Sequence, residues 1–263
     1  MDVLGRNNVK VFGKGEQAMI FSHGFGCDQN MWRHVTPGFM NKYKIVLFDH
    51  VGSGQSDLKA YDKQKYDSLE AYADDILEIC QFLQLHKSIF VGHSVGAMMG
   101  ILSAIKEPER FEKLVLVGPS PCYINDNDYT GGFSLSDIES MLKIMEQDYV
   151  NWSTEFAPFI MGNPGTPSLG EELVRSFCSM DQDIARHFAR VTFLSDNRSD
   201  LPKLQTQSLI LQCADDMIAP EEVGDYLYHN LKNATLINLK ATGHCPNLSA
   251  PLETIAAMES YLA

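Results

Sequence analysis

One stretch, residues 88–100 with the sequence SIFVGHSVGAMMG, restricts the fold of this chain more than any other. The apolar run that opens it is typical of a buried strand, and the small and apolar residues that close it are typical of a helix. At the junction, Gly92 and Gly96 flank Ser94 in the pattern G-x-S-x-G. In this context the turn raises the serine hydroxyl above the edge of a sheet, and larger side chains at the glycine positions would clash with the adjacent strand and helix. We therefore predict that Ser94 is a catalytic nucleophile.

Strand and helix patterns alternate on both sides of this turn. Continuous apolar runs in QAMIFSHGFG, KIVLFDH, SIFVGHS, KLVLVGPSP, SLILQCA and TLINL are typical of strands buried on both faces. Residues 68–85 and the segments VGAMMGILSAIKEP, EEVGDYLYHNL and ETIAAMESYL carry helical patterns. This alternation predicts an α/β fold with a mostly parallel central sheet and helices on both faces. The length and the 44% hydrophobic content fit one domain over residues 1–263.

Between residues 122 and 197 the alternation stops, and helix patterns follow one another without an intervening strand. Capping-box patterns predict helix starts at Ser136, with Glu139, and at Ser168, with Glu171. We predict that residues 122–197 form a helical lid inserted into the single domain, over the ligand edge of the sheet. The alternative is a helical insertion without that role. The lid is favoured by aromatic residues that indicate an apolar underside, namely Phe133, Tyr149, Trp152, Phe156, Phe159, Phe188 and Phe193.

A serine nucleophile needs a base, and the base needs an orienting acid, in the chain order serine, acid, histidine for this kind of turn. His244 lies in ATGHCPNLSAP, between a predicted strand and the last predicted helix, where a loop can hold its ring over Ser94. Asp215 and Asp216 are adjacent at the end of an earlier strand. Because neighbours at a strand end point to opposite sides, one of them faces His244, and we predict Asp216. Asp215 is then a solvated or loop-capping residue.

Acyl transfer also needs N–H donors for the developing oxyanion. The Val95 N–H, directly after the nucleophile, is one predicted donor. The second is the Phe25 N–H, in the loop His23-Gly24-Phe25-Gly26 that follows the first apolar run. The alternative for this loop is a simple glycine turn. His23 and His93 are predicted to be packing or hydrogen-bonded scaffold groups.

Composition excludes several functions. The net charge of -13 argues against nonspecific binding to nucleic acid or anionic lipid. None of the six cysteines forms a C-x-x-C pair, which argues against a zinc site or redox motif. Acyl transfer through a serine requires no cofactor and no metal, so we expect neither. The first residues lack the apolar region of a signal peptide, and no apolar run is long enough to span a bilayer. We therefore expect a cytoplasmic protein without disulfides, and nothing in the sequence demands more than a monomer.

Several stretches also match a known family: HGFGCDQNMW, VLFDHVGSGQSDL, FVGHSVGAMMG, VGPSPCYIND, FLSDNRSDL, QCADDMIAP and GHCPNLSAP. In these the chain resembles the α/β-hydrolase superfamily, and within it the RsbQ-like proteins of bacterial stress signalling and their relatives, the plant karrikin and strigolactone receptors. VGPSPCYIND and QCADDMIAP favour the RsbQ-like branch. The resemblance spans Ser22 to Pro251 and implies the α/β-hydrolase fold with an inserted lid. It also implies Asp216 as the acid, because the family's acid lies in a D-x-x-x-P pattern that Asp216 and Pro220 match.

The resemblance further implies the function. The family pocket is lined by lid and loop aromatics, which implies Phe25, Tyr123, Phe133, Trp152 and Phe193 as substrate-binding residues here. The implied activity is hydrolysis of a small hydrophobic ester or lactone without a cofactor. The implied role is positive regulation of a sigma-factor stress response through a serine/threonine phosphatase that carries a PAS domain. The alternatives are an ordinary carboxylesterase without a signalling role and a ligand-binding receptor with slow or no turnover.

Overall fold

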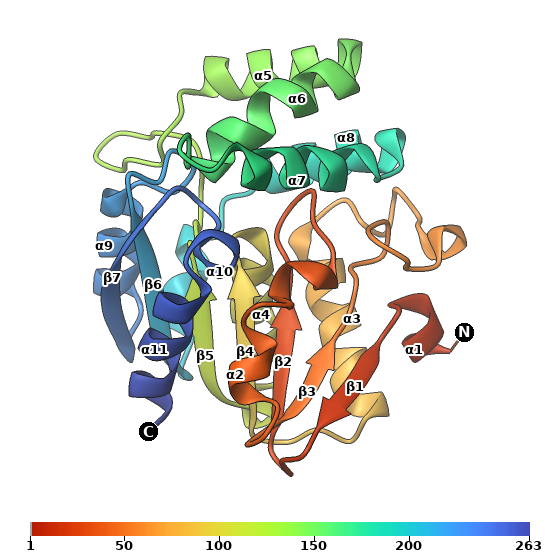
Figure 1. The fold of residues 1–263 in the computed structure, drawn as a ribbon, viewed down its shortest axis with the longest axis vertical. Coiled ribbons are helices and arrows are strands. Elements are labelled where there is room, and N and C mark those ends of the chain that lie inside the picture. The colour runs from red at the N-terminus through yellow and green to blue at the C-terminus, as the bar shows by residue number, and fades with distance from the viewer. Residues whose placement is uncertain (1) are drawn as a thin grey trace.

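A seven-stranded sheet forms the centre of residues 2–263, the part of the chain that the computed structural model describes (Figure 1). The strand order is β1-β3-β2-β4-β5-β6-β7, and all neighbours are parallel except β1 with β3. The strands are β1 Lys10–Gly13, β2 Ala18–Ser22, β3 Lys44–Leu47, β4 Ser88–His93, β5 Phe111–Val117, β6 Gln207–Ala214 and β7 Ala234–Thr242. The predicted α/β fold with a mostly parallel sheet is confirmed.

The inner strands β2 and β4 are buried along their whole length, as their continuous apolar runs predict. Strand β1 is exposed at every residue and lies at the edge of the sheet. The sequence analysis does not predict β1. A short, exposed edge strand has no apolar run to mark it, so its pairing with β3 is visible only in the folded chain.

Helices cover both faces of the sheet. In Figure 1, α2 Thr36–Phe39 and α11 Pro251–Leu262 lie in front of the strands, and α3 Leu69–Phe82 and α4 Val95–Lys106 lie behind them. Helix α4 is buried over its first ten residues, because it packs between β4 and α3. Outside residues 122–197, the remaining helices are α1 Val3–Arg6, α9 Glu221–Asn230 and α10 Pro246–Ser249, with 3-10 turns at Gln29–Trp32, Leu58–Ala60, Pro108–Arg110 and Arg198–Lys203.

Four helices lie together beyond the carboxyl ends of the parallel strands, at the top of Figure 1. They are α5 Leu135–Gln147, α6 Tyr149–Met161, α7 Pro167–Cys178 and α8 Gln182–Phe193. Before α5, residues 122–133 are not helical, contrary to the expectation of helices from residue 122. They form a loop held by isolated bridges, such as Ile124 with Phe133. None of the helices in residues 2–263 combines the length and apolarity that a bilayer crossing requires.

Both predicted helix starts in this block are wrong by two residues. Helix α5 is capped by Ser134, whose hydroxyl accepts from the Asp137 N–H at 3.1 Å while the Asp137 carboxylate accepts from the Ser134 N–H at 3.0 Å. Asp137, although shorter than the usual glutamate, completes the capping box in the same way. Helix α7 begins at Pro167, whose fixed backbone angle suits a first helical position, and its cap residue Thr166 makes no side-chain bond.

Candidate active site

Ser94 lies in the tight turn between β4 and α4, with a left-handed φ of 56° and a ψ of -125°. The glycines on either side allow this turn. A Cβ at Gly92 would lie 2.6 Å from the Ala97 Cα, and a Cβ at Gly96 would lie 2.5 Å from the His23 carbonyl oxygen. The backbone strain at Ser94 costs roughly 1–3 kcal/mol, and the packed elements on both sides maintain it.

Three side chains predicted from separate parts of the sequence meet at this turn. The Ser94 Oγ lies 2.8 Å from the His244 Nε2. The His244 Nδ1 lies 2.8 Å from one carboxylate oxygen of Asp216 and 3.1 Å from the other. All three residues are buried. The arrangement allows His244 to take a proton from Ser94 while the carboxylate fixes the tautomer and orientation of the ring.

The structure places Asp216, and not Asp215, against His244. Asp215 is exposed and takes a left-handed φ of 50°, which turns the chain so that the two neighbours point apart. The Asp216 Oδ1 also accepts from the Ile218 N–H at 2.9 Å and the Ala219 N–H at 3.1 Å. These bonds hold the carboxylate in place.

The two predicted oxyanion donors lie beside Ser94. A Cβ on Gly24 would lie 3.3 Å from the Ser94 Cβ, so the loop that carries Phe25 runs directly against the turn. Within residues 2–263, neither the Phe25 N–H nor the Val95 N–H donates to an acceptor. Val95 is the first residue of α4, where a free N–H is expected. Both groups are therefore available to an oxygen bound at Ser94.

The loop that carries His244 is bonded to the end of α6. The His244 N–H donates to the Ile160 carbonyl at 3.0 Å, and the Asn163 amide donates to the Thr242 carbonyl at 3.1 Å. A Cβ on Gly243 would lie 2.0 Å from the Met161 carbonyl oxygen, so only glycine permits this approach. The backbone of His244 is thus held directly by one of the four helices above the sheet.

Other buried histidines surround the site in neutral form. The His93 Nε2–H donates to the His244 carbonyl at 2.7 Å, and burial, with the nearby His244, lowers the pKa of His93 to about 3. The His23 Nε2 accepts from the His50 N–H at 3.1 Å. Burial lowers the pKa of His23 and lowers the pKa of His50 well below its usual value. His23 and His93 thus occupy the scaffold positions predicted for them.

These lowered pKa values predict an acid-sensitive fold. Each pKa is lower in the folded chain than the usual 6.5, so the unfolded chain binds more protons below that pH. The stability contributed by neutral His23, His50 and His93 is full above about pH 6.5. As the pH drops, each histidine lowers it by at most about 1.4 kcal/mol per pH unit, until the pH reaches the pKa of that histidine in the folded chain. Urea unfolding at about pH 7.5 and about pH 5 measures the difference. His93→Gln should remove one histidine's share, whereas exposed His34→Gln should leave the dependence unchanged. Equal pH dependence in wild type and His93→Gln would contradict this account.

A small cavity of about 20 Å³ opens onto Ser94. That volume holds about one water molecule, whereas pockets for small ligands measure roughly 300–1,000 Å³. Of the predicted substrate-binding residues, Phe25, Tyr123 and Phe193 line it. The Tyr123 hydroxyl lies 3.5 Å from the Ser94 Oγ. The lining of the cavity is predominantly apolar.

The structure does not bring Phe133 and Trp152 to this cavity. The ring of Trp152 stacks on Phe177 at 5.7 Å between centroids and meets the edge of Phe25 at 6.2 Å, so it packs behind residues of the wall. Phe133 lies in the loop before α5. Both line a separate, open and largely apolar groove of about 590 Å³ between α5 and α6.

Sequence reasoning missed part of the wall. Cys27, Ile218 and Cys245 line the cavity and lie within two residues of predicted site residues, which is a signal the sequence contains. The others come from α6, α7 and α8, namely Ile160, Leu173, Phe177 and Thr192. Only the packing of the helices identifies them. Within residues 2–263, no three acidic, histidine or cysteine side chains are grouped as metal ligands.

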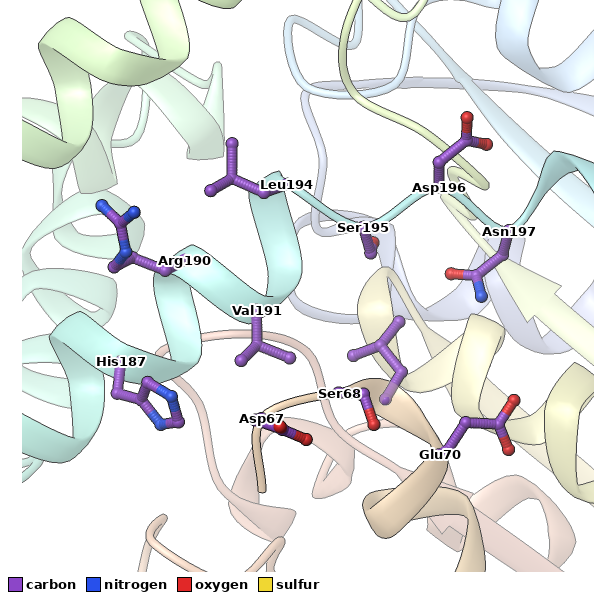
Figure 2. A pocket seen from close by; sticks show the side chains of 11 residues that line it. Asp67, Ser68, Glu70, His187, Arg190, Val191, Leu194, Ser195, Asp196 and Asn197 are labelled. Carbon is purple, nitrogen blue, oxygen red and sulfur yellow. The ribbon is translucent and has the colours of Figure 1, made fainter. Parts of the chain in front are cut away.

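A second, polar hollow of about 440 Å³ lies between the start of α3 and the end of α8 (Figure 2). His187, Arg190, Val191 and Leu194 line it from α8, and Figure 2 shows the Val191 side chain pointing toward the start of α3. These positions follow the spacing of a single helix face. The hollow includes none of the residues that meet at Ser94. Helix α8 therefore separates this hollow from the cavity, which Thr192 and Phe193 line from another side of the helix.

The geometry agrees with a comparison of the whole chain with known families. Residues 17–251 match the family described as alpha/beta hydrolase fold. The chain belongs to the α/β-hydrolase family. Among its relatives in this family, Karrikin insensitive 2 receptor CA of Petunia hybrida is 38% identical over 246 residues, covering 93% of this chain and 91% of the receptor. Strigolactone esterase D14 of Arabidopsis thaliana is 38% identical over 253 residues, covering 96% and 94% of the two chains.

A solved α/β-hydrolase structure is similar over nearly the full length. A hydrolase from Oleispira antarctica superposes with a TM-score of 0.97 and 38% identity, covering 99% of this chain and 96% of that one. The family therefore includes hydrolases, esterases and receptors at similar distance from this chain. Family membership establishes the fold, and the residues of the site must decide the activity.

Proposed function

We propose that this α/β hydrolase is a carboxylic ester hydrolase that acts on a small hydrophobic ester or lactone, with Ser94 as nucleophile, His244 as base and Asp216 as acid. The observation that carries the proposal is the continuous hydrogen-bonded path from the Ser94 Oγ through His244 to Asp216, at 2.8 Å for each link. The strained turn at Ser94 and the free N–H groups beside it support the same chemistry.

The mechanism follows from the positions of the atoms. His244 Nε2 takes the hydroxyl proton as the Ser94 Oγ forms a bond to the substrate carbonyl carbon. The N–H groups of Phe25 and Val95 hold the resulting oxyanion, and one such donor is typically worth roughly 3 kcal/mol. As the ester bond breaks, His244 gives its proton to the leaving alcohol. Water then attacks the acyl group by the same route and regenerates Ser94, while Asp216 stays ionised throughout.

We further propose that the hydrolase has a signalling role as an RsbQ-like positive regulator of a stress response, acting through a PAS-domain serine/threonine phosphatase. The stretches VGPSPCYIND and QCADDMIAP support this branch, and the similarity to karrikin receptors supports a receptor-like role. The closed cavity favours it as well, because a ligand must displace wall residues to enter. An ordinary carboxylesterase and a receptor without turnover share the same residues and are separated by kinetics.

The decisive test is rapid mixing with p-nitrophenyl butyrate, followed through many turnovers and analysed by peptide mass spectrometry. We expect a burst of p-nitrophenol, then slow steady release, with a butyryl group on the peptide that contains Ser94. Fast linear release with the same acyl peptide supports an ordinary carboxylesterase. An acyl group elsewhere, or release no faster than in buffer, overturns the proposed chemistry.

The signalling role has a separate test. A pull-down with the full chain from its source cells should recover a PAS-domain phosphatase in stoichiometric amount. Recovery of no stoichiometric partner contradicts the signalling role and leaves the hydrolase proposal standing.

A further inference from the structure

Thr192 places an unpaired hydroxyl in the wall of the Ser94 cavity. It belongs to α8, lines the cavity and is 1% exposed. Its Oγ1 is buried and has no hydrogen-bond partner within residues 2–263. A buried hydroxyl without a partner destabilises a fold, so its presence calls for a physical reason.

Four other helical hydroxyls in this chain bond to a carbonyl of their own helix. Ser103, Ser153, Thr154 and Thr254 each donate to the carbonyl four residues earlier, at 2.8 to 3.1 Å. Such back-bonding is the common choice for a helical threonine. The Thr192 hydroxyl makes no bond of this kind, although its own helix has the carbonyl of residue 188 at the same spacing.

The position of Thr192 in α8 explains what this hydroxyl can reach. The face of α8 formed by residues 187, 190, 191 and 194 lines the polar hollow of Figure 2, and Thr192 is not on it. Thr192 and Phe193 instead line the cavity, together with Ile160, Leu173 and Ile218 from other segments. The hydroxyl is therefore a polar group among apolar wall residues, on a different element from Ser94.

We propose that the Thr192 hydroxyl is a specificity group, which donates a hydrogen bond to a second oxygen of the substrate, away from the reacting carbonyl. The preferred substrate is then an oxygenated ester or lactone, and a purely hydrocarbon acyl group leaves the hydroxyl unpaired. This inference rests on the proposed hydrolase function and specifies its substrate class. It follows the general rule that a mostly apolar pocket fixes ligand orientation with a few placed polar groups.

The test compares wild type with Thr192→Val, which keeps the shape and removes the hydroxyl. The probes are p-nitrophenyl hexanoate and three ethers of equal chain length, the propoxyacetate, 3-ethoxypropanoate and 4-methoxybutanoate. For each protein, we divide the kcat/KM for each ether by the kcat/KM for hexanoate. Comparing this ratio between wild type and variant cancels the intrinsic reactivity of each ester. We expect this ratio to fall about 10-fold in the variant for at least one ether, whatever the absolute rate of each protein with hexanoate. A change below about threefold for all three ethers overturns the inference.

Thermal unfolding provides a readout that does not depend on catalysis. Because Thr192→Val removes an unpaired buried hydroxyl, its Tm should equal or exceed that of wild type. A clear fall in Tm means that the hydroxyl has a structural partner, and it overturns the inference. Thr192→Ser, which keeps the hydroxyl, should retain the ether preference. If wild type and Ser94→Ala hydrolyse hexanoate equally, the proposed function fails, and this outcome is distinct from a missing ether preference.

Discussion

Ser94→Ala is expected to reduce kcat for p-nitrophenyl butyrate by roughly 10⁴-fold to 10⁶-fold. The variant removes the proposed nucleophile, while the N–H groups of Phe25 and Val95 remain to give residual catalysis. Steady-state kinetics measure the loss, and thermal unfolding should show an intact fold, because alanine fits the space of serine.

The matched control for this variant is Ser153→Ala. Ser153 is also a buried serine, but its hydroxyl donates to the Tyr149 carbonyl within α6 and does not line the cavity. Its replacement should lower stability by about 1 kcal/mol and leave kcat within about twofold. Retained activity in Ser94→Ala would contradict the assignment of Ser94 as the nucleophile.

Asp216→Asn is expected to lower kcat by about 10⁴-fold with little loss of fold. The asparagine oxygen can still accept from the Ile218 and Ala219 N–H groups, which bond to the Oδ1 of Asp216. Its amide, however, presents donors to the His244 Nδ1, which also carries a proton in the active tautomer. The imidazole of His244 then adopts the other tautomer, in which the Nδ1 accepts from the amide and the Nε2 carries the proton. With a proton on the Nε2, His244 cannot take the proton of Ser94.

Asp215→Asn provides the control for charge and composition. It removes the same formal charge at the adjacent, exposed position, and should change kcat by less than about twofold. The comparison uses kcat near pH 8 for both variants, with thermal unfolding to confirm the fold. Equal effects of the two replacements would refute the assignment of Asp216 as the acid.

The sequence predicted the arrangement around Ser94 because each of its residues follows directly after a strand or opens a helix. Parallel strands end at one edge of a sheet, so Ser94 after β4, Asp216 after β6 and His244 after β7 must lie near each other once the sheet order is set. Local pattern and sheet geometry therefore suffice. The exposed strand β1 and the loop at residues 122–133 carry no such pattern, and the sequence did not predict them.

The wall of the cavity was predicted less completely, because it depends on how four helices rotate and pack. Aromatic composition indicated an apolar underside for the helices of residues 122–197, but it did not show which side chains face Ser94. Phe133 and Trp152 line the groove between α5 and α6, whereas Phe177 and Thr192, from α7 and α8, line the cavity. A threonine in a helix has no sequence signal that separates a satisfied hydroxyl from an unpaired one.

The hydrogen bond from the His244 N–H to the Ile160 carbonyl joins the loop that carries the proposed base to the end of α6. Any displacement of the end of α6 must either break this bond or move the His244 backbone with it. The occupancy of the cavity and the position of α6 are therefore thermodynamically linked. Under the proposed mechanism, an acyl group on Ser94 that shifts α6 would be favoured, by the same free energy, by a protein that binds the shifted α6. This backbone bond is the contact through which the proposed chemistry at Ser94 would reach the outer surface.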